Sequence, residues 1–400
     1  MARGVVVVVC SAASIASIGG HAAGRVRGSG TARVISAALA PARSATALRF
    51  ISQASTAAAP SIAFFRITTG LNGTGALGDS GDASLSADGR FVTFTSDASN
   101  LVADPRHGSI KDVYVYDRAT AQTTRESLGP SGAPATGASF APVISTGGRF
   151  VAFWSVATDL VAPETEPGVS HVYVRDRQLA ATTLVDVSSG GARGSGNAYQ
   201  PAISSDGRFI AFWSLASNLV ADDLNGCGDV FVRDLAAGTT ERVSIPTPGF
   251  APPCTFDSRD PSISADGRFV AFDGAATSAA PGSQLAVYVR DRATATTSLV
   301  SIDANSQPFR DFAFAPSINA DGRFVVFQVN RPAGGSGLYM RDRAAGSTLG
   351  PLPGQFLSAH ASADGRFVSY LTLDHDAFVI DAATGAVTAI ATLASDVSAV

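Results

Sequence analysis

Short apolar strands alternate with polar turns along most of this chain, and the same pattern returns several times. Its clearest copy is Ser-Ala-Asp-Gly-Arg-Phe-Val at residues 86–92. Counted from Arg90, equivalent arginines follow at intervals of 59, 59, 60, 55 and 43 residues: Arg149, Arg208, Arg268, Arg323 and Arg366. The Asp-Gly pair tolerates the positive φ angles of a tight hairpin turn, so each copy predicts two antiparallel strands. A unit that recurs at such a period indicates a repeat architecture.

Two more strands follow each predicted hairpin. In the first unit they span residues 112–116 and 123–127. Later copies of the third strand read HVYVRD, DVFVRD, AVYVRD, GLYMRD and AFVID; they begin at His171, Asp229, Ala286, Gly337 and Ala377. Strands that are apolar on both faces suit sheets stacked face to face. Six units of four antiparallel strands therefore predict an all-β fold, a six-bladed β-propeller. An open solenoid would need polar capping repeats, which the sequence lacks.

The composition agrees with an all-β fold and argues against nucleic-acid binding. The chain has a single lysine and four glutamates, so most of its charge comes from Arg and Asp. Lysine and glutamate favour helices, whereas aspartate favours turns. With 40 glycines, 20 prolines and 46% apolar residues, the chain can turn often and still bury a large core. The net charge of −4 comes without a basic stripe, so we expect no nucleic-acid partner.

The first sixty residues predict a leader and a linker rather than a blade. Arg3, an apolar run over 4–18 and small residues at 19–23 are typical of a secretory signal peptide, so we expect residues 1–23 to be removed. A disordered Ala-rich extension is the alternative. Residues 24–60 have the Ala, Gly, Ser and Arg content of a linker, and the propeller is expected over 61–400. No later segment is apolar for the length of a membrane span. We therefore expect a secreted or periplasmic mature chain.

The start of the propeller offers a way to close the ring. Residues 65–69 and the Gly-rich run after them are similar to the fourth-strand segment 182–196. We expect this N-terminal strand to complete or flank the last blade, beside residues 386–390.

The repeated sequence S-x-D-G-R-F-V-A-F, followed by D-V-Y-V-R-D, resembles the WD-like repeat of TolB-type propellers. The resemblance covers about residues 61–395, nearly all of the predicted folded part. It implies a propeller that works through protein–protein contact in the periplasm; similar propellers also occur as non-catalytic domains of peptidases. Residues 1–60 do not have the pattern of the α/β domain that precedes the blades of TolB, so the resemblance identifies no particular partner.

Several short strings imitate active-site motifs without the partners that the chemistry needs. Residues 73–78 (GTGALG) fit the dinucleotide fingerprint, but a strand rather than a helix is predicted after them. Residues 78–81 (GDSG) are similar to the serine motif of trypsin-like proteases, but none of the five histidines stands in a recognisable base motif. The four glutamates lie outside the strand repeats, so a glycosidase pair would need aspartates. We expect no catalytic residue and no organic cofactor.

One acidic loop predicts a metal site. Asp222, Asp223, Asn225 and Asp229 present carboxylate and amide oxygens at short spacing, which suits Ca²⁺. No bidentate glutamate closes the loop, and its spacing is not that of an EF-hand. The alternative is a solvated turn whose Asp and Asn side chains cap their own backbone.

The cysteines favour an oxidising compartment. Removal of the leader takes Cys10 with it and leaves Cys227 and Cys254. In four-stranded blades the loop between the second and third strands and the loop between blades lie on one face, and each cysteine is in such a loop. We expect a disulfide between them. Two unrelated thiols are the alternative.

The same face is expected to carry the function. Its loops between second and third strands are long in blades one to three and short in blades five and six. The only tryptophans, Trp154 and Trp213, occupy equivalent positions in adjacent blades; they pack between the blades or, if exposed, anchor a partner. We expect a monomeric, non-catalytic propeller that binds a protein through this face. The alternatives are a polysaccharide lyase or hydrolase with a metal-assisted site, and a surface-displayed structural module.

Overall fold

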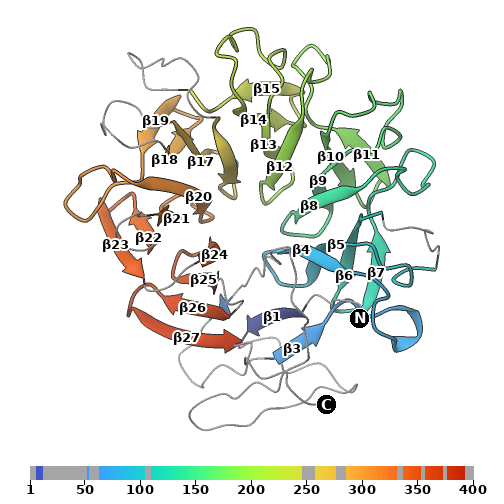
Figure 1. Ribbon diagram of the computed structural model, residues 1–400, viewed down its shortest axis with the longest axis horizontal. Helices are drawn as coiled ribbons and strands as arrows, with labels where there is room; N and C mark the ends of the chain where they lie inside the picture. Colours follow the sequence, from blue (N-terminus) through green and yellow to red (C-terminus); the bar gives the residue numbers. More distant parts are fainter. Residues whose placement is uncertain are drawn as a thin grey trace.

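The computed structural model describes residues 6–11, 52–53, 63–103, 110–245, 257–275, 285–330, 337–352, 356–372 and 376–391. Six four-stranded antiparallel sheets surround a common centre (Figure 1), which confirms the predicted all-β, six-bladed propeller. Strands that are consecutive in the chain are hydrogen-bonded neighbours within each sheet. The first strand of each blade lies nearest the centre and the fourth lies at the rim.

Each blade takes its four strands from one repeat. Blades one to three contain β4 (Ser80–Leu85), β5 (Phe91–Ser96), β6 (Asp112–Asp117) and β7 (Gln122–Arg125); β8 (Ser139–Ile144), β9 (Phe150–Ser155), β10 (His171–Asp176) and β11 (Ala181–Leu184); and β12 (Ala198–Ile203), β13 (Phe209–Ser214), β14 (Asp229–Asp234) and β15 (Thr239–Arg242). Blades four to six contain β16 (Arg259–Ile263), β17 (Phe269–Ala275), β18 (Leu285–Asp291) and β19 (Thr296–Leu299); β20 (Phe312–Ile318), β21 (Phe324–Asn330), β22 (Gly337–Asp342) and β23 (Ser347–Leu352); and β24 (Phe356–Ala361), β25 (Phe367–Thr372), β26 (Ala377–Asp381) and β27 (Ala386–Ala391).

The up-and-down order of the strands gives the ring two different faces. The turns between first and second strands and between third and fourth strands lie on one face, here called the turn face. The loops between second and third strands, and the connections between blades, lie on the other, here called the long-loop face. In blade two, β9 pairs with β10 from Phe150 opposite Asp176 at the turn face to Ser155 opposite His171 at the long-loop face.

The Asp-Gly turns are held by their own side chains, as blade three shows. Ser204 Oγ donates to Asp206 Oδ1 at 2.6 Å and accepts from Phe209 N at 2.9 Å. Gly207 has a φ of 78°, a left-handed conformation that favours glycine. The predicted hairpin turns are therefore confirmed. Ser and Asp recur in the motif because their side chains satisfy the polar groups of the turn.

The same turns also join neighbouring blades, a role that sequence reasoning missed. A Cβ on Gly207 would lie 2.2 Å from Cδ2 of Phe150 in the preceding blade. Gly148 faces Phe91 in the same way, so blade two keeps this glycine although Gly147 replaces the aspartate. The equivalent pairs are Gly267–Phe209, Gly322–Phe269 and Gly365–Phe324. Each of these phenylalanines thus packs on a backbone where a side chain would not fit.

The motif arginines form ion pairs on the turn face. Each binds the aspartate that ends the third strand of its own blade: Arg90–Asp117, Arg149–Asp176, Arg208–Asp234, Arg268–Asp291, Arg323–Asp342 and Arg366–Asp381. Arg208 donates through Nε and Nη2 to both oxygens of Asp234, and this hydrogen bonding lowers the pKa of Asp234 to about 2. Because these six arginines are already paired, the repeat specifies the fold rather than a binding site.

Apolar clusters run from one blade into the next. Val113 and Val115 of β6 share a buried cluster with Phe153 and Tyr173 of blade two. The first strand of every later blade packs against the blade before it, from β8 on blade one to β24 on blade five. No strand of blade six makes comparable contact with a strand of blade one within the described residues.

A small three-stranded sheet lies outside the six blades. It contains β1 (Val6–Ser11), β2 (Ser52–Gln53) and β3 (Ala63–Arg66), in the order β2–β1–β3. Blade six has its own fourth strand, β27, whereas β3 pairs antiparallel with β1. The N-terminal strand therefore does not complete blade six, because β27 already fills that position; the alternative, that it flanks this blade, stays a prediction.

The described residues contain no helix that is long and apolar enough to cross a bilayer. The boundaries expected for the leader, 1–23, and for the linker, 24–60, stay predictions, because the structure describes only residues 6–11 and 52–53 of this region.

Candidate functional site

Four aromatic side chains form a continuous band across blades two and three, at the long-loop end of their first two strands. Phe140 of β8 stacks on Trp154 of β9 with ring centroids 4.4 Å apart. Tyr199 of β12 meets the edge of Trp154 at 4.9 Å and stacks on Trp213 of β13 at 5.2 Å. All four side chains are half-buried. Each such ring pair adds about 0.5–1.5 kcal/mol beyond its burial, so the band is a rigid platform.

A cation lies at each end of this aromatic band. Lys111 Nζ lies 5.9 Å from the centroid of Phe140, and Arg259 Cζ lies 5.0 Å from the centroid of Trp213. Both distances are within cation–π range. Arg259 also binds Asp257 at 2.7 Å, whereas Lys111 has no carboxylate partner among the described residues. The blade-one end of the band therefore carries the less neutralised positive charge.

The repeat pattern of the sequence identified two of the four aromatic residues of this band. Trp154 and Trp213 occupy equivalent places near the end of the second strand, and Tyr199 links them across the blade junction. The expectation that they pack between blades agrees with this arrangement, and their role in partner binding stays a prediction. Sequence reasoning missed Phe140 and Tyr199. Pairing of the first and second strands of the predicted hairpins could have identified them, because Phe140 lies opposite Trp154 and Tyr199 lies opposite Trp213.

Exposed apolar side chains lie on the long-loop face of each of blades one to three. Leu77, Val156, Leu215 and Leu224 expose 67%, 43%, 47% and 89% of their surface, respectively. Val156 and Leu215 each follow a tryptophan of the band by two residues. These four residues and the aromatic band are here called the long-loop patch. Apolar side chains that cluster on an exposed surface are typical of an interaction site.

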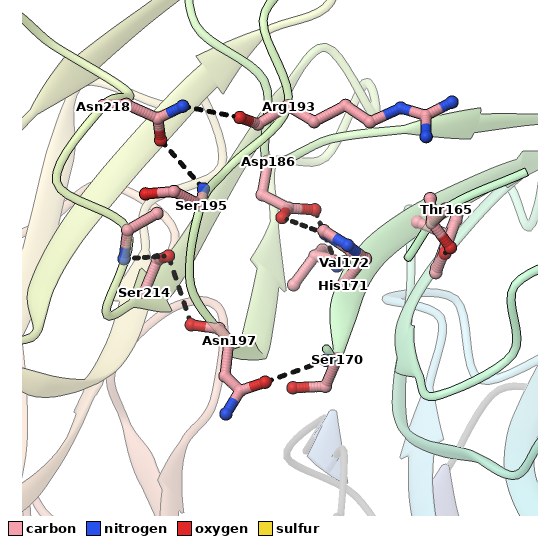
Figure 2. Close-up of polar contacts among 12 residues, drawn as sticks. Thr165, Ser170, His171, Val172, Asp186, Arg193, Ser195, Asn197, Ser214 and Asn218 are labelled. Atoms are coloured by element: carbon pink, nitrogen blue, oxygen red, sulfur yellow. Dashed lines mark hydrogen bonds and ion pairs between the residues drawn. The ribbon is translucent and has the colours of Figure 1, made fainter. Parts of the chain in front are cut away.

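One polar residue in each long loop holds this face in place. Asn218 accepts from Ser195 N at 2.9 Å and donates to Arg193 O at 2.7 Å (Figure 2). Asn100 makes the matching two bonds in blade one, and Asp159 accepts a backbone N–H in blade two. These bonds tie the loop between second and third strands to the connection that enters the same blade. The patch is therefore preorganised, which reduces the entropic cost of binding.

Blade four replaces the tryptophan of the band by a buried acid. Asp273 occupies the position of Trp213, is 2% exposed, and is hydrogen-bonded to Asp260 of β16. Burial, with the charge of Asp260, raises the pKa of Asp273 to about 8. Gln200 of blade three donates its amide to Asp260. The carboxyl group of Asp273 therefore retains its proton at neutral pH, beside the aromatic band.

A buried His–Asp pair lies in blade two (Figure 2). His171 Nδ1 lies 2.6 Å from Asp186 Oδ2, Val172 N donates to Asp186 Oδ1 at 2.9 Å, and the His and Asp side chains are fully buried. Burial raises the pKa of Asp186, and its hydrogen bond to His171 opposes that shift. Blades one and three have an Asp–Ser bond at the same two positions, Asp112–Ser127 and Asp229–Ser244. We therefore interpret this pair as a variant of a structural bond of the blades.

The predicted calcium ligands lie together, but a guanidinium group already contacts two of them. Arg242 Nη1 lies 3.1 Å from Asp223 Oδ1 and 3.3 Å from Asp229 Oδ2. Asn225 directs its Nδ2 to Asp229 at 2.7 Å, and its Oδ1 accepts a backbone N–H. The part of the chain that the structure describes has no group of three or more His, Cys, Asp or Glu side chains arranged for a metal. Calcium binding through Asp222, Asp223, Asn225 and Asp229 stays a prediction.

A hollow of about 520 Å³ lies beside this loop, between blades two and three. Its lining includes residues 188–190, Asp223, Leu224 and Thr240. Burial, with the charge of Asp229, raises the pKa of Asp223 to about 6. Because Leu224 belongs to both, the hollow adjoins the long-loop patch.

Cys227 is part of a disulfide bond. Its expected partner, Cys254, lies outside the described residues, so the pairing stays a prediction. A disulfide in this loop fits an oxidising compartment.

Comparison with known proteins supports the fold and leaves the activity open. No protein-family model matches the chain, and no curated protein matches it. An oligogalacturonate lyase in complex with manganese has a TM-score of 0.51 at 12% identity, over 79% of this chain and 78% of that chain. The oligogalacturonate lyase from Vibrio parahaemolyticus gives 0.50 at 12% identity over the same shares.

TolB from Acinetobacter baumannii gives a TM-score of 0.41 at 16% identity, over 67% of this chain and 53% of that chain. The chain thus spans about half the length of that TolB. At such identities the likeness concerns the fold alone. The chain itself shows six four-stranded blades, so the fold is a six-bladed β-propeller.

Proposed function

We propose that this protein is a non-catalytic binding module that holds a protein partner on its long-loop patch. The observation that carries the proposal is the position of the exposed apolar side chains. Leu77, Val156, Leu215 and Leu224 lie on the same face of three adjacent blades as the half-buried aromatic band. A binding surface needs such an apolar and aromatic patch, and Trp and Tyr are enriched among the residues that dominate binding energy.

Binding would remove this patch from water without reordering it. Burial of an exposed leucine contributes about 1.5–3 kcal/mol at most, so several such residues around a rigid aromatic platform suffice for a specific complex. The bonds of Asn100 and Asn218 already hold the loops. Lys111 favours a partner that places an acidic residue at the blade-one end of the band, because complementary charge aligns the two proteins.

We further propose that the protein acts as a monomer in the periplasm or after secretion. The disulfide of Cys227 and the leader-like residues 1–23 support this location. Mass spectrometry of the chain recovered from the envelope fraction and the medium of the source would test it. A chain recovered only from the cytoplasm with a free Cys227 thiol would contradict it.

Variants of the patch, with a control on the opposite face, test the binding proposal. Val156→Asp and Leu215→Asp introduce a charge into the patch. Leu179→Asp does so on the turn face, where Leu179 is 71% exposed. Tagged full-length proteins are used to capture partners from the envelope fraction, with quantitative mass spectrometry. We expect one partner set to be lost with both patch variants and retained with Leu179→Asp; equal capture by all three would contradict the proposal.

Action on an acidic polysaccharide is the second candidate, and the carboxyl pair beside the band favours it. Asp273 retains its proton at neutral pH, and the neighbouring Asp260 accepts from Gln200; a buried protonated acid beside a second carboxyl group suits proton transfer. One structure of similar fold is an oligogalacturonate lyase in complex with manganese. The test is incubation with oligogalacturonate, with and without Mn²⁺, followed by ultraviolet absorbance of unsaturated products. Turnover that Asp273→Asn abolishes would favour this candidate over the binding module.

A further inference from the structure

The six blades account for six fourth strands, and the described residues contain a seventh. It is β3, which is followed by the same loop that leaves a complete blade. In that loop Thr69 forms a β-bridge with Gly75, as Val187 does with Arg193 after β11. The same bridge follows β7 and β19. The segment of residues 63–79 thus has the form of a blade's last strand and exit loop, although the described residues before it (6–11 and 52–53) form no complete blade.

The strand β1 pairs with β3 as a third strand pairs with a fourth. Val6 lies opposite Arg66, the last residue of β3, just as Tyr173 lies opposite Leu184, the last residue of β11. Three more antiparallel pairs follow in the same register in both cases. Figure 1 shows β1 and β3 between blade six and blade one, with β3 on the outer side. This is the one junction in the ring where the described strands of successive blades make no contact comparable to the others.

An unpaired hydroxyl group marks the same place. In four blades, the second residue after the fourth strand accepts a backbone N–H from the third strand: Ser127 from Val113, Asp186 from Val172, Ser244 from Val230 and Ser301 from Val287. Thr68 stands at this position after β3. It is fully buried, and its Oγ1 has no hydrogen-bond partner. Because a buried unpaired hydroxyl group is costly, Thr68 occupies a position suited to receive a strand N–H.

We propose that the place between blade six and blade one is a strand-acceptor site and that the N-terminal strand Val6–Ser11 is its occupant. In this role β1 is the third strand of an incomplete seventh blade and closes the ring. Its valines have the β-propensity and apolar character of the other third strands. In blade one the corresponding N–H comes from Val113, the residue just before the one that pairs with the last residue of β7. Because β1 lies within the expected leader, this N-terminal clasp holds in the chain before processing, and removal of residues 1–23 opens the site.

The test uses the full-length chain. Val7→Pro disrupts β1, because proline lacks the N–H of a ladder bond and is not tolerated inside a sheet. Ala13→Pro, two residues beyond β1, is the matched control. Hydrogen exchange with mass spectrometry follows the amides of residues 63–69, and urea denaturation gives the unfolding midpoint. We expect Val7→Pro to lose exchange protection at 63–69 and to lower the midpoint, whereas Ala13→Pro does neither.

Thr68→Val supplies a second measurement that keeps the strand intact. If the strand that occupies the site donates a backbone N–H to Thr68 Oγ1 in solution, loss of the hydroxyl group increases amide exchange at residues 63–69. Unchanged exchange in both Val7→Pro and Thr68→Val would overturn the proposal. A native chain that begins after residue 23 and whose amides at residues 63–69 are still protected from hydrogen exchange would also overturn the proposal, because another segment would then fill the site.

Discussion

Gly207 provides the sharpest test of how the blades are joined. Its replacement by alanine adds one methyl group to the Asp-Gly turn of blade three. The backbone there has a φ of 78°, which strains any residue other than glycine. The new Cβ would also lie 2.2 Å from Cδ2 of Phe150, a ring that belongs to blade two. The substitution therefore acts on the turn and on the blade junction together.

The cost of the left-handed backbone and the cost of overpacking against Phe150 can be separated by comparing two glycine variants. A left-handed conformation costs a residue with a side chain about 1–2 kcal/mol, and overpacking of a filled interior costs about 1–3 kcal/mol. We therefore expect Gly207→Ala to lower the free energy of unfolding by about 2–5 kcal/mol. Gly238, in another turn of the same blade, has a φ of 67°, and a Cβ there would meet nothing closer than 3.9 Å. Gly238→Ala should therefore show only the smaller, conformational cost.

Urea denaturation monitored by tryptophan fluorescence measures both variants. A double-mutant cycle with Phe150→Ala isolates the contact, because removal of the ring should reduce the cost of Gly207→Ala to that of Gly238→Ala. The interlocking of turn and ring would be refuted by equal costs for the two glycine variants. An additive cycle would refute it independently.

Three further predictions concern charge and redox state. Arg242→Gln leaves the buried carboxylates of Asp223 and Asp229 without their cation and should cost about 3–5 kcal/mol of stability. In a thermal-shift titration, Ca²⁺ should then raise the melting temperature of the variant more than that of the wild type. An equal response of both proteins to Ca²⁺ and EDTA would show that Arg242 does not neutralise the site. Because the pKa of Asp273 is raised to about 8 in the folded state, its contribution to stability is present below the unfolded value of 3.8 and is lost as pH rises through 8. Asp273→Asn should therefore stabilise the protein increasingly in urea denaturation between pH 5 and pH 8, and a pH-independent difference would show that buried Asp273 does not hold a proton. Thiol counting by mass spectrometry should find Cys227 and Cys254 free only after reduction, whereas two free thiols without reductant would exclude the bond.

Most of the fold could be predicted because the information is local and repeated. Each copy of Ser-x-Asp-Gly-Arg-Phe contains its own turn, in which Ser and Asp side chains satisfy the backbone and glycine takes a positive φ. Six copies, each followed by two more apolar strands, leave few architectures other than a ring of blades. The N-terminal strand shows the limit of local information: residues 65–69 have the pattern of a fourth strand, but that pattern does not show which blade the strand belongs to, and β27 already fills this position in blade six.

The candidate site was predictable only in part, because its contacts join residues far apart in the chain. The equivalent positions of Trp154 and Trp213 follow from the repeat. Their neighbours Phe140 and Tyr199 come into contact with them only through strand pairing and the packing of one blade on the next. Arg242 shows the same limit, since nothing in residues 222–229 indicates that a guanidinium from β15 lies against two of their carboxylates.

The sequence by itself determined the number of blades, their strands, the turn that begins each blade and the face that carries the long loops. These properties depend on residues within one repeat, where a side chain and the backbone it serves are a few positions apart. Only the tertiary structure decided what the motif glycines and phenylalanines do between blades, which aromatic rings meet, and which carboxylates share a cation. Those outcomes depend on strand pairing and on the packing of successive blades, which bring residues far apart in the chain into contact.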